Sequence, residues 1–417
     1  MGIETVNARH DLTPRRIAAF NVKYSPNLGD GLLSICLEKQ VARSRPDLRV
    51  TSFDLSGRDG FDVPSARSAR PVVLAALNKA PAPLRAAATY AALQMLRATR
   101  LEPLWRRSLG DFDGVIVGGG NLMTDADLNF PVKVSAALRA TAAHGLPASV
   151  FGVGVGERFS DRGRRLFKDA LARVDLRAVR VRDAPSLRNW RTHDLSEGAL
   201  GAATCRDPGV LIADYFDAGP RADHVSICLT DPAALQYHSA HDVAFATIRE
   251  WFAQVTQALT AAGRDVFLFT NGSPEDRAFL RDFGPVLAAS GGGRVHFAPE
   301  FSEPYALAKF IGSSSCIVAH RMHACIAAFS FGVPHIGLVW DPKLRGFFDS
   351  VDRSRFLLDP ATHSPQVAAA RIEETISHGV DREMRARATD EARDEIAELC
   401  DALVPHGSQK ADRAGAP

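Results

Sequence analysis

The sequence predicts an α/β fold with two domains, each built on a parallel sheet. Short runs rich in β-branched and aromatic residues alternate with longer helical patterns, which is the rhythm of a doubly wound sheet. The alternation stops at a polar, turn-rich segment, residues 214–223, and then restarts. A chain of 417 residues is also long enough for two cores. We therefore expect two Rossmann-like domains, over residues 1–215 and 216–404.

Five runs in the first half have the composition of buried strands. They are, in chain order, residues 17–22, 49–55, 114–117, 148–153 and 178–181. Helical patterns lie between them at residues 31–43, 131–143, 162–173 and 185–190. Because parallel strands need crossover connections, usually helical, these elements predict one parallel sheet.

The second half repeats this pattern. Its strand candidates are residues 225–229, 266–269, 295–297, 316–319 and 335–339, all separated by helical stretches. Two consecutive parallel-sheet domains, with carboxyl-end loops facing a common cleft, describe the GT-B architecture. A final helix at residues 382–403 is expected to pack back across the domain junction. Residues 405–417 lack apolar periodicity, so we expect a disordered tail there.

Composition excludes several classes of function. The chain carries 50 basic and 48 acidic residues, a formal charge of +2, which gives no electrostatic indication of nucleic-acid binding. Its six cysteines are scattered and form no C-x-x-C pair, as expected of reduced core thiols. The amino terminus lacks the apolar core of a signal peptide, and no charge-free run is long enough to span a bilayer. We expect a soluble, cytoplasmic protein.

The densest group of functional candidates lies at residues 316–343. A strand-like run, Cys316–Ala319, leads into Arg321 and His323, and a small-residue helix follows. This order places a guanidinium and an imidazole at the carboxyl end of a buried parallel strand, where open α/β sheets bind their ligands. Arginine offers a planar fork for a carboxylate or phosphate, and histidine changes charge near neutral pH. Lys343 adds a cation after the next strand.

An early loop has the composition of a ligand-binding loop. Asn27, Gly29 and Asp30 follow the first strand candidate and precede the first helix. Asp30 is expected to cap that helix, and Gly29 allows the backbone to approach a ligand closely. An N-cap turn without a ligand explains the same residues about as well, and only the position at the carboxyl end of a strand favours binding.

A glycine run forms the second candidate loop. Gly118, Gly119, Gly120 and Asn121 come directly after the strand at residues 114–117. Three glycines allow positive φ and expose backbone N–H groups to a phosphate or a sugar hydroxyl. The run matches neither the Walker A loop nor the dinucleotide fingerprint, so it does not indicate nucleotide binding. A tight structural turn is the alternative to a ligand loop.

A cationic strand end forms the third candidate. Arg182 follows the strand at residues 178–181, and we expect Asp183 to be the N-cap and Pro185 the first turn of the next helix. Arg182 is placed to point toward the cleft, and a surface ion pair explains it equally well.

Histidine spacing raises the question of a metal. His320 and His323, like His238 and His241, are three residues apart, but no third ligand follows at standard spacing. Arg321 would also repel a cation, so we expect no metal site.

Together these motifs resemble the polysaccharide pyruvyl transferase family over roughly residues 20–350. The family pattern contains an early N-x-G-D loop, a G-G-G turn, an R-D-x-x-S segment, and a late R-x-H followed by G-x-P and a lysine. The matching residues are Asn27–Asp30, Gly118–Gly120, Arg182-Asp183 with Ser186, Arg321–His323, Gly332–Pro334 and Lys343. This chain departs from the pattern at Met322, where leucine is more familiar, and in the longer early loop at residues 23–26.

The resemblance implies transfer of a pyruvyl group from phosphoenolpyruvate to two hydroxyls of a sugar, which forms a cyclic ketal in surface or exopolysaccharide biosynthesis. It implies that His323 is the acid/base and that Arg321, Arg182 and Lys343 clamp the donor. The two loops would hold sugar hydroxyls or donor phosphate. Phosphoenolpyruvate is a co-substrate, and no cofactor is implied. Two alternatives remain, a GT-B glycosyltransferase using a nucleotide sugar and a non-catalytic glycan-binding subunit.

A basic insertion at residues 64–107 separates two predicted strands. Its eight lysines and arginines against one glutamate give a charge of +7. Such a segment could rest on the anionic inner face of the plasma membrane, where a lipid-linked oligosaccharide acceptor would lie. A helical hairpin packed on the sheet, with solvated arginines, is the alternative.

Overall fold

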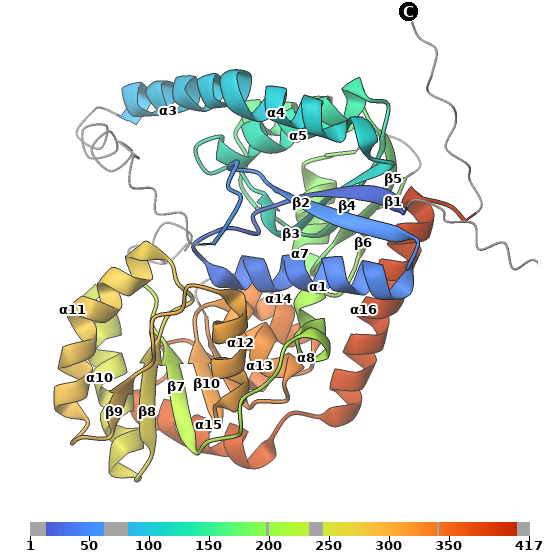
Figure 1. Ribbon diagram of the computed structural model, residues 1–417. Helices are drawn as coiled ribbons and strands as arrows, with labels where there is room; N and C mark the ends of the chain where they lie inside the picture. The colour runs from blue at the N-terminus through green and yellow to red at the C-terminus, as the bar shows by residue number, and fades with distance from the viewer. Residues whose placement is uncertain (1–13, 62–81, 197–199, 233–244, 340–341, 407–417) are drawn as a thin grey trace, which may run out of the picture.

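The computed structural model describes residues 14–61, 82–196, 200–232, 245–339 and 342–406 (Figure 1). This part of the chain contains two six-stranded sheets, and the strands in both pair in parallel. Helices pack on the sheets, so the predicted α/β class with two parallel, Rossmann-like sheets is confirmed. The exact boundary predicted between residues 215 and 216 stays a prediction.

The first sheet has the order β2-β1-β3-β4-β5-β6. Its strands are β1 (Arg15–Asn21), β2 (Leu48–Asp54), β3 (Gly114–Met123), β4 (Pro147–Val155), β5 (Asp175–Val181) and β6 (Ala203–Thr204). The helices of this half are α1 (Leu28–Ser44), α3 (Ala82–Leu96), the π-helix η1 (Arg97–Leu101), α4 (Glu102–Ser108), the 3-10 helix η2 (Leu109–Asp111), α5 (Asn129–Ala143), α6 (Asp161–Leu171) and α7 (Ala184–Thr192). As predicted, Asp183 caps α7 by accepting the Ser186 N–H at 2.6 Å, and Pro185 lies in the first turn.

The second sheet has the order β12-β11-β10-β7-β8-β9. Its strands are β7 (His224–Cys228), β8 (Asp265–Phe269), β9 (Val295–Phe297), β10 (Cys316–Ala319), β11 (His335–Leu338) and β12 (Leu357–Leu358). The accompanying helices are α10 (Phe245–Ala261), α11 (Pro274–Ser290), α12 (Pro304–Ser313), α13 (Met322–Ser330), α14 (Pro342–Ser350), the 3-10 helix η4 (Ser354–Phe356) and α15 (Pro365–His378).

Each sheet has one point where the strand order reverses, and the candidate loops lie there. In the first sheet this point is between β1 and β3, which pair directly. In the second sheet it is between β7 and β10. Ligands of doubly wound folds bind outside the carboxyl ends of the strands at such switch points. The loops after β1 and β10 therefore lie at the positions where doubly wound folds bind their ligands.

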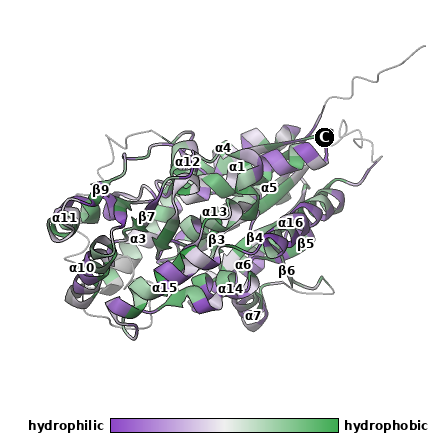
Figure 2. Cartoon of the chain, turned by 90° about the horizontal axis from the view of Figure 1, so that it is seen from below, coloured by the Kyte–Doolittle hydropathy of each residue, from purple (hydrophilic) through white to green (hydrophobic). Residues whose placement is uncertain are grey.

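Apolar residues fill the strands and the helices between the sheets. In Figure 2 the strands β3 and β4 are hydrophobic, whereas α16 (Arg382–Leu403) carries many hydrophilic residues. Residues 323–330 of α13 are all buried, consistent with the small residues that predicted this helix. The tight packing of α13 fixes the position of the charged tip that precedes it.

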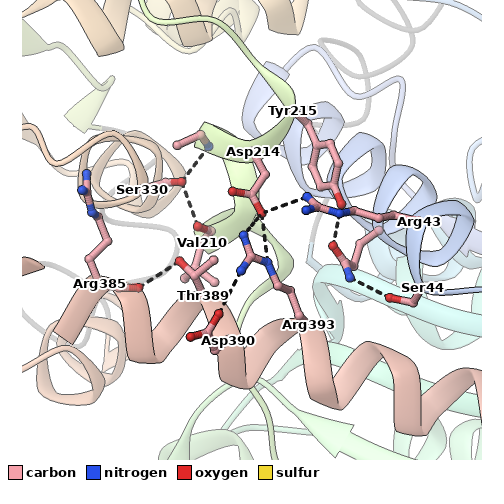
Figure 3. A network of polar contacts seen from close by, with 12 residues as sticks. Arg43, Ser44, Val210, Asp214, Tyr215, Ser330, Arg385, Thr389, Asp390 and Arg393 are labelled. Carbon is pink, nitrogen blue, oxygen red and sulfur yellow. Dashed lines mark hydrogen bonds and ion pairs between the residues drawn. The ribbon is translucent and has the colours of Figure 1, made fainter. Parts of the chain in front are cut away.

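The last helix crosses from the second half back to the first. α16 contacts β4, β5 and α1, as the sequence predicted for a helix across the junction. The segment between the sheets includes the 3-10 helix η3 (Pro208–Leu211) and α8 (Ile212–Tyr215). Figure 3 shows the polar contacts between this segment and α16. Arg393 of α16 donates to Asp214 at 2.6 Å, and Arg43 of α1 lies 3.9 Å from the same carboxylate. Asp214 thus links α1 and α16.

Several local predictions were wrong. α1 begins at Leu28 rather than near Gly31, so Asn27 occupies the cap position and Asp30 lies in the first turn instead of capping the helix. The glycine run does not form a turn after a strand, because β3 continues through it to Met123. The strands β6 and β12 were missed because they are two residues long.

Some predictions fall on residues that the structure does not describe. Residues 64–81 of the basic insertion and residues 407–417 of the predicted tail lie outside the described ranges, as do His238 and His241. The described part of the insertion forms α3, η1 and α4. Within the described residues, no helix is both long and apolar enough to cross a bilayer.

Candidate active site

The loop after β1 meets the second half of the chain. Leu28 donates its backbone N–H to the carbonyl of Asn271, which follows β8, at 2.8 Å. This contact brings Gly29 against His323 at the start of α13: a Cβ atom on Gly29 would lie 2.5 Å from the Cβ and 2.7 Å from the Nδ1 of His323. Position 29 therefore requires glycine, because any side chain would overlap the imidazole.

His323 and Asp30 form a buried pair at the centre of this contact. The Nδ1 of His323 lies 3.6 Å from Oδ1 of Asp30, and their side chains are 10% and 14% exposed. The Nε2 of His323 is buried and has no hydrogen-bond partner among the described residues. The imidazole therefore has one nitrogen facing a carboxyl group and one that is left for another partner.

Burial moves the two pKa values in opposite directions. It lowers the pKa of His323 to about 3, and the charges of Arg182, Arg321 and Lys343 act in the same direction. It raises the pKa of Asp30 to about 7, against a hydrogen bond from Ser25 and the charges of nearby arginines. The imidazole is consequently uncharged at neutral pH, and Asp30 is the member of the pair that takes up a proton as the pH falls through about 7.

Arg321 is held by a carboxylate that sequence reasoning missed. Its Nε donates to Oδ2 of Asp276 at 2.8 Å, and its Nη2 lies 2.6 Å from the same oxygen. The Asp276 side chain is fully buried, and that of Arg321 is 18% exposed. Burial raises the pKa of Asp276, and the charge of Arg321 opposes this rise. Asp276 thus orients Arg321 and leaves part of the guanidinium accessible.

Arg182 lies at the carboxyl end of β5, beside the end of β3. Its Nη2 lies 3.5 Å from Oδ1 of Asn121, and its Nε is 3.5 Å from Oδ2 of Asp183. The Arg182 side chain is only 3% exposed. Both Arg182 and Asn121 pack over Gly154, where a Cβ would lie within 2.5 Å of each side chain. The predicted residues Arg182 and Asn121 are therefore neighbours, and Arg182 is not a surface ion pair.

The glycine run has a structural cause inside β3. The register with β4 shifts between Gly120 and Met123, and both Gly119 and Gly120 have positive φ, at 79° and 86°. A Cβ on Gly120 would lie 3.4 Å from Oδ1 of Asp30, whereas one on Gly118 would collide with the carbonyl of Phe151 in β4. Gly120 thus borders the site, and Gly118 serves the packing of the sheet.

The structure brings most of the predicted site residues together. Gly29 and Asp30 lie against His323, and Gly120 borders Asp30. Asn121 lies beside Arg182, and Lys343 in α14 is close enough to lower the pKa of His323. Asn27 caps α1, and its buried Oδ1 has no hydrogen-bond partner among the described residues.

Asp276 could have been found from its sequence position. It follows β8 as part of a Ser-Pro-Glu-Asp helix start, at the carboxyl edge that also carries Arg321. Across the ranges that the structure covers, no group of three or more histidine, cysteine or acidic side chains is arranged to hold a metal. The expectation of a metal-free site stays a prediction.

A cavity of about 600 Å³ opens beside this site. It lies at the carboxyl ends of β5 and β6, between α7, α14 and α16, and its lining includes Arg182 and Met322. Met322 directly precedes His323, so the cavity and the buried pair are adjacent. Its volume is in the range of sites for small-molecule ligands, about 300–1,000 Å³.

Solved structures with a similar fold are sugar-nucleotide enzymes. UDP-GlcNAc 2-epimerase from Methanocaldococcus jannaschii matches with a TM-score of 0.55 at 9% identity, over 93% of this chain and 99% of that chain. A putative UDP-N-acetylglucosamine 2-epimerase from Listeria monocytogenes matches with a TM-score of 0.54 at 12% identity, over 93% and 95%. S. aureus MnaA in complex with UDP matches with a TM-score of 0.53 at 10% identity, over 95% and 99%. The structural similarity shows a GT-B-like fold, and at identities this low it shows nothing of function.

The match to a family model is more specific. No curated protein matches the chain significantly. The model for polysaccharide pyruvyl transferase matches residues 27–342, from the cap of α1 to the first residue of α14. That range contains every site residue discussed above except Lys343, which directly follows it. The match covers most of the chain, and this protein therefore belongs to the polysaccharide pyruvyl transferase family.

Proposed function

We propose that this protein transfers a pyruvyl group from phosphoenolpyruvate to two hydroxyls of a sugar and so forms a cyclic ketal. The observation that carries the proposal is the buried His323–Asp30 pair, whose histidine pKa is lowered by burial and by three nearby cations, Arg182, Arg321 and Lys343. Cations at the site suit a donor with a carboxylate and a phosphate, and a proton-holding pair suits an enol ether that must be protonated. Membership of the family supports the same reaction.

Binding of phosphoenolpyruvate would itself raise the pKa of His323, the proposed acid. Burial is the largest cause of the lowered pKa of His323, and the charges of Arg182, Arg321 and Lys343 lower it further. A bound trianion offsets those charges, so the pKa of His323 rises and its Nδ1 can take the proton of Asp30. The imidazolium then forms more readily when phosphoenolpyruvate is bound. Because Nε2 is buried, neighbouring side chains must move for the donor to reach it.

The reaction balances with these groups alone. His323 gives a proton to the methylene carbon of phosphoenolpyruvate, which forms a C–H bond and an oxocarbenium-like centre. One sugar hydroxyl attacks this carbon and returns its proton to His323. The C–O bond to phosphate then breaks, the second hydroxyl attacks, and its proton leaves with the phosphate. The arginines and Lys343 stabilise the negative charge on the leaving group.

An assay of phosphate release tests this proposal. Phosphoenolpyruvate is incubated with 4-nitrophenyl galactosides, glucosides and N-acetylmannosaminides and with lipid-linked sugars. We expect release that depends on an acceptor. Release of UDP from UDP-sugars, without turnover of phosphoenolpyruvate, would instead support a GT-B glycosyltransferase. Saturable glycan binding without turnover of either donor would support a non-catalytic subunit.

A cytoplasmic location in surface or exopolysaccharide assembly is part of the proposal. All six cysteines are buried and free of disulfides, which is usual in a reducing compartment. A lipid-linked acceptor would bring the enzyme to the inner face of the membrane. On α3, Leu84 and Met95 are 63% and 69% exposed. They are three helical turns apart and thus on one face, which is suited to insertion at a lipid surface.

Co-sedimentation with vesicles tests that contact. We expect binding to anionic vesicles at low salt, weaker binding of Met95→Asp, and little binding to neutral vesicles. Equal binding of the wild type and Met95→Asp would refute a role for this face of α3.

A further inference from the structure

The cavity beside the active site has walls from both halves of the chain. Arg182, Asp183 and Asp207 line it from the first half, and Gly346 and Phe347 of α14 line it from the second. A Cβ on Gly346 would lie 3.1 Å from the Cβ of Asp183, so α14 is closely packed on the start of α7. A ligand in this cavity would therefore contact both halves.

Two aspartates of the cavity wall have unused hydrogen-bonding capacity. Oδ1 of Asp207 accepts the backbone N–H of Gly209 at 2.9 Å, but its Oδ2 is buried without a hydrogen-bond partner. Oδ2 of Asp183 is also buried without a hydrogen-bond partner, and its ion-pair contact is with Nε of Arg182 at 3.5 Å. Asp183 and Asp207 are 5% and 6% exposed. Buried carboxyl oxygens without partners are suited to accept bonds from ligand hydroxyls.

The remaining polar lining mixes donors and acceptors. Arg188 and Arg345 are exposed at the cavity, and neither makes an ion pair within the described residues. Arg206 is already held by Glu391 of α16 at 2.6 Å. Four arginines and five carboxylates line the cavity in all. Because neither sign dominates, the lining suits a neutral molecule with many hydroxyls better than a polyanion.

One part of the wall is apolar. Met322, Ile326 and Phe347 contribute side chains from α13 and α14. Sugars present C–H groups on one face and hydroxyls at the rim, so they need both kinds of surface. Aromatic and aliphatic side chains with a few convergent polar groups are the usual composition of small-molecule sites.

We propose that this cavity is the acceptor subsite and binds an uncharged saccharide, with Asp207 and Asp183 accepting sugar hydroxyls. The inference rests on the proposed pyruvyl transfer. Met322 lines the cavity and directly precedes His323 in the chain, so a sugar held there lies close to the acid/base. Arg182 lies at the boundary, where it contacts the donor on one side and lines the cavity on the other.

Asp207→Asn tests the subsite because it changes one atom. The amide oxygen still accepts the Gly209 N–H, while an amino group replaces Oδ2. We expect affinity for a bound 4-nitrophenyl glycoside to fall about tenfold, a typical loss for a hydrogen bond to a charged group. Affinity for phosphoenolpyruvate, measured by calorimetry, should change less than about twofold, a small fraction of such a bond. Asp217→Asn, on an exposed residue outside the cavity, is the matched control and should change neither affinity.

Each other outcome contradicts the inference. Equal glycoside affinity of Asp207→Asn and wild type would overturn it, as would a wild type that binds no glycoside of the panel. An equal loss of phosphoenolpyruvate affinity would assign the cavity to the donor. Saturable UDP binding that Arg345→Ala abolishes would assign it to a nucleotide. Glycoside binding that depends on Asp207 but gives no phosphate release would refute pyruvyl transfer and leave the saccharide site standing.

Discussion

Replacing Gly29 with alanine should displace His323 from Asp30 while the chain still folds. The new Cβ would lie 2.5 Å from the Cβ and 2.7 Å from the Nδ1 of His323. Since carbon atoms pack at about 3.5–4.0 Å, the start of α13 that carries the His323 Cβ must move away from α1 by about 1 Å, and the imidazole moves with it. A displacement of about 1 Å in a catalytic site costs about 10²-fold in rate, so we expect kcat for phosphate release to fall by that factor.

Stability distinguishes this effect from misfolding. Overpacking lowers the free energy of unfolding by about 1–3 kcal/mol. Alanine in place of glycine within a helix raises it by about 0.5–1 kcal/mol. The free energy of unfolding in urea should therefore fall by only about 0–2.5 kcal/mol. Gly110→Ala is the control, because no atom lies within 4 Å of the new Cβ. Full activity in a folded Gly29→Ala protein would refute the close contact between Gly29 and His323.

Three further variants test the electrostatics of the site. Burial raises the pKa of Asp30 to about 7, so the stability that its protonated form provides is lost as the pH rises from about 4 through 7. In urea titrations, Asp30→Asn should therefore gain stability relative to wild type over this pH range. A difference in unfolding free energy that does not change with pH would contradict the raised pKa. Asp276→Ala leaves Arg321 without its buried carboxylate and should lower the free energy of unfolding by about 3 kcal/mol, whereas a change below about 1 kcal/mol would show that the pair is not structural. Arg182→Lys loses a planar fork and should raise KM for phosphoenolpyruvate roughly tenfold or more in initial-rate kinetics, with an unchanged KM arguing against contact with the donor.

The sequence predicted those features that depend on local pattern. β10, α13 and β11 form from an apolar run, a small-residue helix and a second apolar run, so the positions of Arg321 and His323 at the strand end followed directly. The strands β8, β9 and β10 also end where their apolar runs end. A continuous apolar run is enough to predict β10, because the buried strands of a parallel sheet are apolar throughout.

Long-range contacts decided the features that were predicted wrongly. β3 continues past Val117 because β4 pairs with it as far as Met123, and no property of the glycines themselves signals this. The start of α1 at Leu28 coincides with a hydrogen bond from Leu28 to Asn271 in the other half of the chain. Pairing partners and contacts between domains are not visible in a window of neighbouring residues.

The ion pairs and pKa shifts of the site could not be predicted from the sequence either. Arg321 and Asp276 are 45 residues apart in the chain and meet only when β8 and β10 flank β7. The low pKa of His323 and the high pKa of Asp30 arise from burial between the two halves. The sequence predicted residues that meet at one site, and the fold moves the pKa values of two of them in opposite directions.

The most direct test of pyruvyl transfer is the mass spectrum of the product formed in D₂O. Wild type, phosphoenolpyruvate and an active glycoside should give a product heavier by one pyruvic acid less one water, with one deuterium in the new methyl group. His323→Ala should give no such product, because the proton delivered to the methylene carbon comes from this imidazole. A ketal formed at the wild-type rate by His323→Ala, or a glycoside that gains no pyruvyl group from the wild type, would contradict the account.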